Sequence, residues 1–252
     1  MEISGKNAIV IGGGSGMGRA SAELLAARGA NIAILDREGS SGKEAAAAIG
    51  ASFYPVDVTD FTGTEEALDD AVAQLGGLHV TVTTAGGGIA ERTLTKKGPH
   101  ALETFRAVLD LNTVATFNIS RLAAAHMSKN EPDDDERGVI INTASIAAFE
   151  GQIGQVAYSA AKAAIAGMCL TMARDLGSLG IRVLAIAPSL FLTGLTAVVS
   201  KEMEAALLRD AAFPKRMGRP EEYAKLVAAI VDNPMLNGQC LRLDAGQRFA
   251  PR

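Results

Sequence analysis

A serine, a tyrosine and a lysine near the middle of the chain have types and spacing suited to proton transfer at a substrate oxygen. Ser145 ends the run GVIINTAS, and Tyr158 and Lys162 follow in the segment YSAAK. Residues four apart lie on one helix face, so the Lys162 ammonium can approach the Tyr158 phenol. An adjacent cation favours the phenolate and lowers the pKa of a tyrosine. The pattern predicts Tyr158 as a general acid or base, with Ser145 donating a hydrogen bond to the same oxygen.

A glycine-rich turn, GGGSGMG, follows the first apolar run and precedes a helical pattern. Such a turn offers free backbone N–H groups and the positive end of a helix dipole, which together suit a pyrophosphate. The spacing G-x-G-x-x-G fails because Met17 stands at its third glycine position, whereas G-x-x-x-G-x-G fits. The cofactor-binding residues expected at this turn are Gly12, Ser15, Gly16, Met17 and Gly18.

Asp36 ends the second apolar run, NIAILD. A carboxylate at that position can accept hydrogen bonds from the adenosine ribose hydroxyls, and it repels a 2′-phosphate by like charge. The neighbouring Arg37 offers the opposite charge, but Asp36 is better placed at the strand end, which favours NAD over NADP. Asp57 and Val58 close the third run in the same way and are expected at the adenine edge.

The sequence also indicates the secondary structure that positions these residues. Short Val/Ile-rich runs alternate with helical patterns along the whole chain. The runs lie at 7–11, 31–35, 52–56, 78–83, 138–143, 181–187 and 239–243, and the helical patterns at 16–28, 40–49, 64–75, 99–128, 155–178, 201–210 and 220–232. Each crossover is long enough for a helix, which predicts an α/β fold with one doubly wound parallel sheet of about seven strands and helices on both faces. We expect a single domain over residues 1–252, in which an excursion at 189–218 covers the substrate.

The fourth run, VTVTTAGGG, ends in a second glycine cluster. In a doubly wound sheet this strand lies beside the first strand and therefore beside the glycine turn. Ala85 and Gly86 are expected against the cofactor.

Charge and composition argue against a nucleic-acid or membrane partner. Lys and Arg total 24 against 28 Asp and Glu, a net charge of −4, and no long basic block occurs. No apolar run reaches about 18 residues, and no secretory leader is evident. Cys169 and Cys240 are expected to be buried free thiols, which indicates a cytoplasmic protein. His79, His100 and His126 lack metal-ligand spacing, so no metal site is expected.

Taken together, these motifs resemble the short-chain dehydrogenase/reductase family over essentially the whole chain. The positions that carry the resemblance are Gly12, Gly16, Gly18, Asp36, Asp57, Ala85, Gly86, Asn112, Ser145, Tyr158 and Lys162. The resemblance implies a Rossmann-like fold and hydride transfer between a nicotinamide and a carbonyl or alcohol carbon.

The same resemblance implies a role for each residue at the reacting centre. Tyr158 would exchange the proton on the substrate oxygen, and Ser145 would orient that oxygen. Lys162 would lower the pKa of Tyr158 and hold the nicotinamide ribose, and Asn112 would bind a water that links Lys162 to solvent. The residues expected at the nicotinamide end of the cofactor, besides Tyr158 and Lys162, are Pro188, Phe191 and Thr193.

A closer resemblance, to the type-2 3-hydroxyacyl-CoA dehydrogenase branch, is carried by RGVIINTASIAAFEGQIGQVAYSAAK and by NPMLNGQCLRLDAG. This branch also includes hydroxysteroid dehydrogenases of broad specificity. The resemblance implies NAD, interconversion of 3-hydroxyacyl-CoA and 3-oxoacyl-CoA in fatty acid metabolism, and a homotetramer with contacts through the long helices. Ser145, Gln155 and Tyr158 are then the expected substrate-contacting residues.

Three positions depart from the family pattern. Ile11 replaces a threonine, Thr83 replaces an asparagine, and Ser189 replaces a glycine. None of the three changes removes a group needed for proton or hydride transfer. Alternative interpretations are a 3-oxoacyl-carrier-protein reductase, a hydroxysteroid or other alcohol dehydrogenase on the same fold, and a cofactor-binding scaffold without turnover.

Overall fold

Seven parallel strands form the central sheet, in the order β3-β2-β1-β4-β7-β8-β9. The computed structural model describes residues 1–193 and 208–251. The strands are β1 (Asn7–Ile11), β2 (Asn31–Asp36), β3 (Ser52–Pro55), β4 (Val80–Thr83), β7 (Gly138–Thr143), β8 (Ile181–Pro188) and β9 (Cys240–Leu243). The α/β fold and its parallel sheet are thus confirmed.

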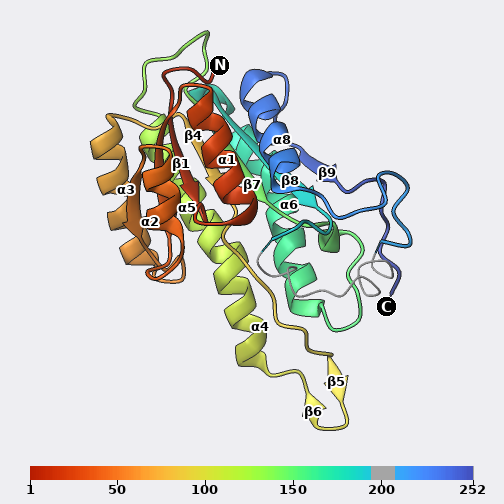
Figure 1. Cartoon of the computed structure of the whole chain (residues 1–252). Coiled ribbons are helices and arrows are strands. Elements are labelled where there is room, and N and C mark those ends of the chain that lie inside the picture. The colour runs from red at the N-terminus through yellow and green to blue at the C-terminus, as the bar shows by residue number, and fades with distance from the viewer. Residues whose placement is uncertain (194–207, 252) are drawn as a thin grey trace.

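Helices cover both faces of the sheet (Figure 1). On one face lie α1 (Gly16–Ala27), α2 (Gly42–Ala48) and α8 (Pro220–Asp232), and on the other lie α3 (Phe61–Leu75), α5 (Ala115–Met127) and α6 (Val156–Leu176). The central strands β1, β4, β7 and β8 are buried along their whole length. Strands covered on both sides need apolar residues at every position, which explains their unbroken apolar runs.

The strand order reverses between β1 and β4, because β2 and β3 lie on one side of β1 while β4 and β7 lie on the other. Ligands of open α/β sheets bind in the crevice beyond the carboxyl ends of the strands at such a reversal. The glycine turn after β1, the glycine cluster after β4 and Ser145 after β7 all meet at this edge.

The expected helix over 99–128 is divided in the structure. It comprises α4 (Leu102–Leu109), a π-helical turn (Asp110–Val114) and α5. Asn112 is buried in the π-turn, and its amide nitrogen donates to the Val108 carbonyl at 2.8 Å. Local π-turns in helices are frequent at functional sites, and here the turn directs Asn112 toward the sheet edge described above.

A small antiparallel hairpin precedes α4 and was not expected from the sequence. Its strands are β5 (Leu94–Thr95) and β6 (Gly98–Pro99), and Figure 1 shows it projecting from the body of the molecule. Pro99 lacks an N–H and disfavours helical geometry in the preceding residue, so the helix begins only after it.

One helical stretch among the described residues, Val156–Leu179, is long and apolar enough to cross a membrane by length and composition alone. The sequence had suggested no such span. In the structure α6 packs against β8 and α4 and buries Ala161, Ile165 and Cys169. One side of α6 thus packs against the core of the protein.

The excursion predicted at 189–218 is described only at its two ends, which lie side by side. The Leu192 N–H donates to the Gly218 carbonyl at 2.8 Å, and the Gly218 N–H donates to the Leu190 carbonyl at 2.9 Å. The expected helix at 201–210 falls almost entirely outside the described residues.

Candidate active site

Ser145, Tyr158 and Lys162 come together at the carboxyl end of β7. Ser145 begins a 3₁₀ turn (Ile146–Ala148) just after the strand, and Tyr158 lies in the first turn of α6. The Ser145 hydroxyl lies beside the Tyr158 phenol and favours its ionised form. The Lys162 ammonium nitrogen lies 5.7 Å from the centre of the Tyr158 ring. The arrangement that the spacing predicted is therefore present.

Lys162 is buried and held by the strand rather than by a carboxylate. Its Nζ donates to the Thr143 carbonyl at 2.8 Å. Burial penalises the charged ammonium and lowers the pKa of Lys162 to about 8. The lysine is thus poised to change charge near neutral pH, with its position fixed by β7.

Burial raises the pKa of Tyr158, and the neighbouring Ser145 hydroxyl offsets only part of that rise. The sequence suggested that Lys162 would lower this pKa, and in the folded chain burial is the largest influence on it. The physical reason is that phenolate formation in a buried site carries a desolvation cost, while the ammonium is directed at the Thr143 carbonyl.

Asn112 ties the π-turn to the glycine cluster after β4. Its amide nitrogen donates to the Gly87 carbonyl at 2.7 Å, and its Oδ1 accepts from the Gly87 N–H at 3.2 Å. A Cβ on Gly86 would lie 2.7 Å from Asn112 Oδ1 and 3.2 Å from Lys162 Nζ. Glycine at 86 therefore lets Asn112, Lys162 and the backbone share one small volume.

The glycine turn after β1 packs closely on neighbouring backbone. A Cβ on Gly12 would lie 2.6 Å from the Ala85 nitrogen, and one on Gly18 would lie 2.2 Å from the Gly12 carbonyl oxygen. Ser15 precedes α1 in an extended conformation and provides no side-chain cap. The first N–H groups of α1, from Gly16 onward, therefore remain available for an anion.

Asp36 closes the glycine turn from the end of β2. Its carboxylate accepts hydrogen bonds from the Gly14 N–H at 2.8 Å and from the Arg37 N–H at 2.7 Å. Asp57 is directed at its own turn, where it accepts from the Thr59 N–H and hydroxyl at 2.9 and 2.7 Å, and these bonds lower the pKa of Asp57. Asp36 is the carboxylate that borders the turn.

Thr193, at the described start of the 189–218 excursion, lies close to the glycine turn after β1. Thr193 Cγ2 lies 3.1 Å from the position of a Cβ on Gly16. Pro188 ends β8, and the buried Phe191 ring packs edge-on against Tyr223, with centroids 6.4 Å apart. Thr193 is thus placed at the predicted cofactor turn, and Phe191 belongs to the core beneath it.

The side chains of Gln155 and Val58 make their contacts within the protein. The Gln155 side-chain oxygen accepts from the Gln152 N–H at 3.0 Å, just before α6. Val58 is buried in the apolar core.

Comparison with known proteins agrees with this geometry. The sequence pattern described as short chain dehydrogenase matches residues 6–204. The chain belongs to this family. A 3-hydroxyacyl-CoA dehydrogenase type-2 of Drosophila melanogaster is 48% identical over 253 residues, which cover 98% of this chain and 99% of the relative.

Two solved structures resemble this short-chain dehydrogenase. A 3-hydroxyacyl-CoA dehydrogenase type-2 from Mycobacterium avium superposes with a TM-score of 0.94 at 41% identity, covering 98% of each chain. A 7α-hydroxysteroid dehydrogenase complexed with NADH and 7-oxo glycochenodeoxycholic acid superposes with a TM-score of 0.88 at 28% identity, covering 100% of this chain and 97% of the other.

Several residues of this short-chain dehydrogenase contribute to the site although sequence reasoning did not single them out. Thr143 supplies the carbonyl for Lys162, and its hydroxyl lies 2.7 Å from the buried Tyr223 hydroxyl. A Cβ on Gly88 would lie 2.8 Å from the Tyr158 ring. The run of three glycines after β4 was the available signal for Gly88, whereas nothing in the sequence pairs Thr143 with a tyrosine 80 residues away.

The structure also describes the surroundings of the three departures from the family pattern. Ile11 is fully buried in the apolar core. The Thr83 hydroxyl makes no hydrogen bond within the described part of the chain, and Thr84 instead donates to the Ile11 and Gly12 carbonyls, both at 3.1 Å. The Ser189 N–H donates to the Leu243 carbonyl at 3.1 Å.

Proposed function

We propose that the chain is an NAD-dependent oxidoreductase that interconverts 3-hydroxyacyl-CoA and 3-oxoacyl-CoA. The observation that carries the proposal is the placement of Ser145, Tyr158 and Lys162 together at the sheet edge that also holds the glycine turn. The 48% identical relative named 3-hydroxyacyl-CoA dehydrogenase type-2 supports the substrate class.

The residues at the sheet edge fit NAD. The open N-terminus of α1 would hold the pyrophosphate, Asp36 would bind the adenosine ribose, and Ala85 and Gly86 would line the path toward Tyr158. The Asp36 carboxylate would repel the 2′-phosphate of NADP. When bound, the oxidised nicotinamide supplies the hydride acceptor and a positive charge beside the phenol.

Tyr158 moves the proton in this mechanism. In the oxidation direction the phenolate oxygen takes the proton from the substrate hydroxyl as the substrate carbon gives up its hydride, which leaves a C=O group. Ser145 donates a hydrogen bond to the same oxygen and fixes its distance from Tyr158. Lys162, held by the Thr143 carbonyl, stabilises the phenolate that burial alone disfavours.

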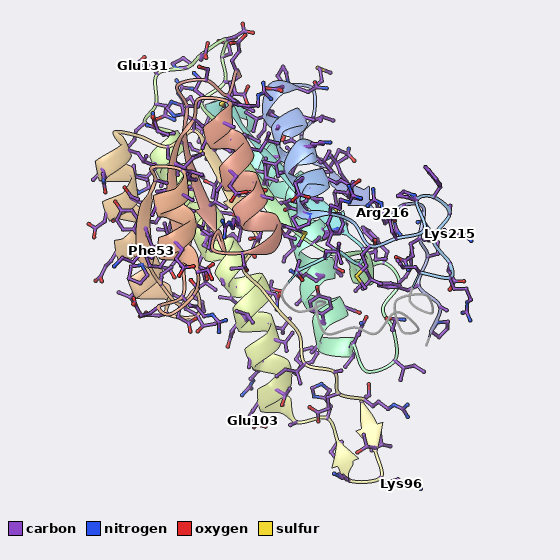
Figure 2. The ribbon with its side chains drawn as sticks, viewed as in Figure 1. Phe53, Lys96, Glu103, Glu131, Lys215 and Arg216 are labelled. Atoms are coloured by element: carbon purple, nitrogen blue, oxygen red, sulfur yellow. The ribbon has the colours of Figure 1, made fainter. Side chains whose placement is uncertain are left out.

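The hairpin before α4 provides support for a phosphate-bearing substrate. Lys96 and Lys97 lie exposed at its turn, and Figure 2 shows Lys96 at the tip. A cavity of about 460 Å³ lies between the first part of this hairpin and the start of α6, lined by Arg92, Leu94, Gln152 and Ser159 among others. We propose that these exposed lysines bind the phosphates of coenzyme A.

Replacing Tyr158 with phenylalanine tests whether the chain is an enzyme of this type. The ring and its packing remain, but the proton-transfer group is lost, so kcat with NAD and 3-hydroxybutyryl-CoA should fall by about 10²-fold or more. Binding of NADH, followed by its fluorescence, should be unchanged. Unchanged turnover in Tyr158→Phe would favour a cofactor-binding scaffold.

Initial rates over matched substrates test cofactor and substrate class. We expect NADH to be preferred over NADPH in the reduction of acetoacetyl-CoA, because of Asp36. The resemblance to the 7α-hydroxysteroid dehydrogenase makes a hydroxysteroid the second candidate substrate. Preference for NADPH, or turnover of hydroxysteroids without turnover of CoA esters, would contradict the leading proposal.

We further propose that four copies of the chain assemble. Helices α4, α5 and α6 present large apolar side chains to solvent, among them Leu102, Phe117 and Leu170, which are 55%, 47% and 47% exposed. Exposed apolar patches of this kind are typical of protein interfaces. Light scattering coupled to size exclusion should give the mass of four chains, and the mass of one chain would contradict the proposal.

A further inference from the structure

The segment that follows β9, residues 244–251, lies against the loop that connects Ser145 to Tyr158. The loop, residues 149–155, contains two glycines and has no regular secondary structure. The two segments are about 90 to 100 residues apart in sequence. Because the loop has no regular secondary structure of its own, contact with residues 244–251 helps to fix its conformation.

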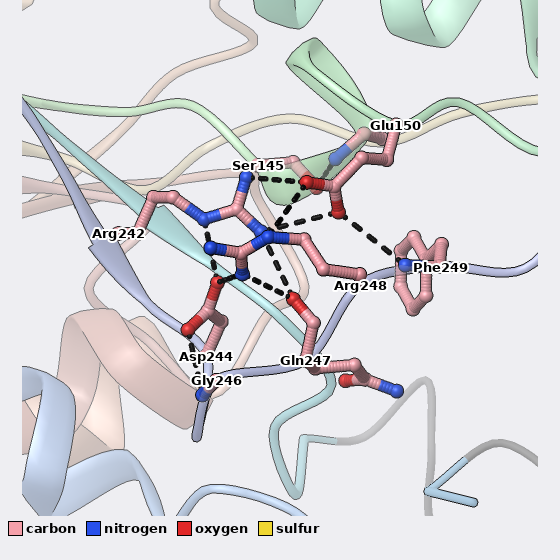
Figure 3. A network of polar contacts seen from close by, with 9 residues as sticks. Ser145, Glu150, Arg242, Asp244, Gly246, Gln247, Arg248 and Phe249 are labelled. Carbon is pink, nitrogen blue, oxygen red and sulfur yellow. Dashed lines mark hydrogen bonds and ion pairs between the residues drawn. The ribbon is translucent and has the colours of Figure 1, made fainter. Parts of the chain in front are cut away.

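An ion pair is the centre of this contact. Arg242, on β9, donates to both carboxylate oxygens of Glu150, at 2.7 and 3.1 Å, and its Nε donates to Asp244 at 2.6 Å. Figure 3 shows Arg242 between these two carboxylates. The guanidinium also lies 5.4 Å from the centre of the Phe149 ring. A bidentate pair with a stacked guanidinium fixes direction as well as distance.

Further bonds join the two segments on either side of the ion pair. Arg248 lies 3.4 Å from Glu150, whose Oε2 also accepts from the Phe249 N–H at 3.3 Å. Farther along the loop, the Gln152 amide donates to the Ala250 carbonyl at 3.2 Å, and the Ile153 N–H donates to the Pro251 carbonyl at 3.1 Å. The loop is thus held at several points along its length.

One short turn connects Glu150 of this ion pair to Ser145. The Glu150 N–H donates to the Ile146 carbonyl at 3.0 Å, and the Ala148 N–H donates to the Ser145 carbonyl at 3.0 Å. The Ser145 hydroxyl accepts from the Ala147 N–H at 3.1 Å. Glu150 therefore closes the same 3₁₀ turn that orients the Ser145 hydroxyl.

We propose that Glu150 and Arg242 are positioning residues, whose ion pair holds the turn after β7 and so fixes the position of the Ser145 hydroxyl relative to Tyr158. The inference rests on the proposed function, because it assigns the pair a role in proton transfer through Ser145. Their effect is exerted through the geometry of Ser145.

Substitution at the pair should lower turnover without weakening cofactor binding. In Glu150→Gln we expect kcat with NAD and 3-hydroxybutyryl-CoA to fall about tenfold, since small misplacements at a reacting centre cost that much or more. The dissociation constant for NADH should change less than about twofold. Arg242→Lys keeps one charged donor and should retain more activity than Arg242→Gln.

A matched control separates this role from a general loss of ion pairs. Arg28 pairs with Asp232 at 2.7 and 3.3 Å, at the far ends of α1 and α8. Arg28→Gln should leave kcat, KM and NADH binding unchanged. A decrease in kcat for Arg28→Gln equal to that for Glu150→Gln, at similar melting temperatures, would overturn the inference.

A background without the Ser145 hydroxyl gives the sharpest test. If Glu150 acts through Ser145, then Glu150→Gln has no further effect on kcat in Ser145→Ala. An equal decrease in both backgrounds, or unchanged kcat in Glu150→Gln and Arg242→Gln, would overturn the inference. Failure of the proposed function is distinguishable, since it would appear as unchanged turnover in Tyr158→Phe.

Discussion

Thr143 connects the buried ammonium of Lys162 to another helix. Its carbonyl accepts from Lys162, while its hydroxyl donates to the Thr83 carbonyl at 2.5 Å and lies 2.7 Å from the Tyr223 hydroxyl on α8. Buried polar groups are stabilising when each has its partner. One threonine thus joins β4, β7, α6 and α8, and Lys162 takes its position from all of them.

The lowered pKa of Lys162 makes stability depend on pH. Because the folded pKa, about 8, lies below the unfolded value near 10.5, both states bind the proton below pH 8 and the cost of burying the charge is complete there. Between these values the unfolded state binds more protons, so folding becomes more favourable as pH rises. From pH 8 to 9.5 the gain from this residue is about 2 kcal/mol.

Lys162→Met removes this dependence. The free energy of unfolding of the variant, relative to the original protein, should decrease by about 2 kcal/mol between pH 7.5 and 9.5. Chemical denaturation at the two pH values measures it, since other titrating groups are common to both proteins and cancel. A constant difference would show that Lys162 keeps an ordinary pKa in the folded chain.

At the scale of elements, the glycine cluster after β4 lets three parts of the site approach one another. Gly86 faces Asn112 and Lys162, Gly87 hydrogen bonds to Asn112, and Gly88 packs on the Tyr158 ring. Side chains at these positions would separate the π-turn from α6. The cluster, which the sequence indicated only as a cofactor contact, also acts as a spacer between catalytic groups.

Gly88→Ala should displace the tyrosine. The added Cβ would lie 2.8 Å from a Tyr158 ring carbon, so the ring must shift, and we expect kcat to fall by about tenfold. Gly167→Ala, in α6, is the control, because a Cβ there meets nothing within 4 Å. It should raise the free energy of unfolding by about 0.5–1 kcal/mol and leave kcat unchanged. Equal kcat in both variants would contradict the spacer role.

Elements with strong periodicity could be predicted, and those set by tertiary contacts could not. The apolar runs led directly to β1, β2, β7 and β8 within a residue or so. The π-turn depends on bonds from Asn112 to Gly87, 25 residues away, and no local pattern encodes it. The hairpin before α4 is too short to show an alternation, although Gly98-Pro99 is a turn signal.

At the scale of the whole molecule, Arg182 holds the end of the sheet opposite the site. It is buried at the start of β8, where it pairs with Glu136 at 2.7 Å and donates to the carbonyls of Ile230, Val231 and Leu236 at or just beyond the end of α8. These carbonyls lack partners within the helix, so the guanidinium satisfies them. One side chain thus joins β8, α8 and the loop before β7.

Arg182→Leu should destabilise the fold without altering the chemistry. Without Arg182, Glu136 keeps only its ion pair with the N-terminal ammonium of Met1 at 2.7 Å, and the carbonyls near the end of α8 lose their donor. The free energy of unfolding should fall by about 3 kcal/mol. Urea denaturation measures this loss. KM and NADH binding of the folded fraction at low temperature should match the original protein, and altered KM would show that this end communicates with the site.

The parts of the candidate site that belong to short sequence motifs could be predicted, as at Ser145, Tyr158 and the glycine turn. The site was not predictable where function depends on residues distant in sequence. Thr143 and Tyr223 meet only after folding, as do Glu150 and Arg242. The direction of the Tyr158 pKa also required the structure, because burial outweighs the effect of its neighbours there.

Asp36 has a consequence for how this protein can evolve. The carboxylate that would repel a 2′-phosphate also bonds the Gly14 N–H and so shapes the turn that receives the pyrophosphate. A lineage that replaced Asp36 to adopt the phosphorylated cofactor would loosen that turn in the same step. A change from NAD to NADP therefore requires a compensating change elsewhere in the turn. A single mutation at Asp36 is not expected to achieve it.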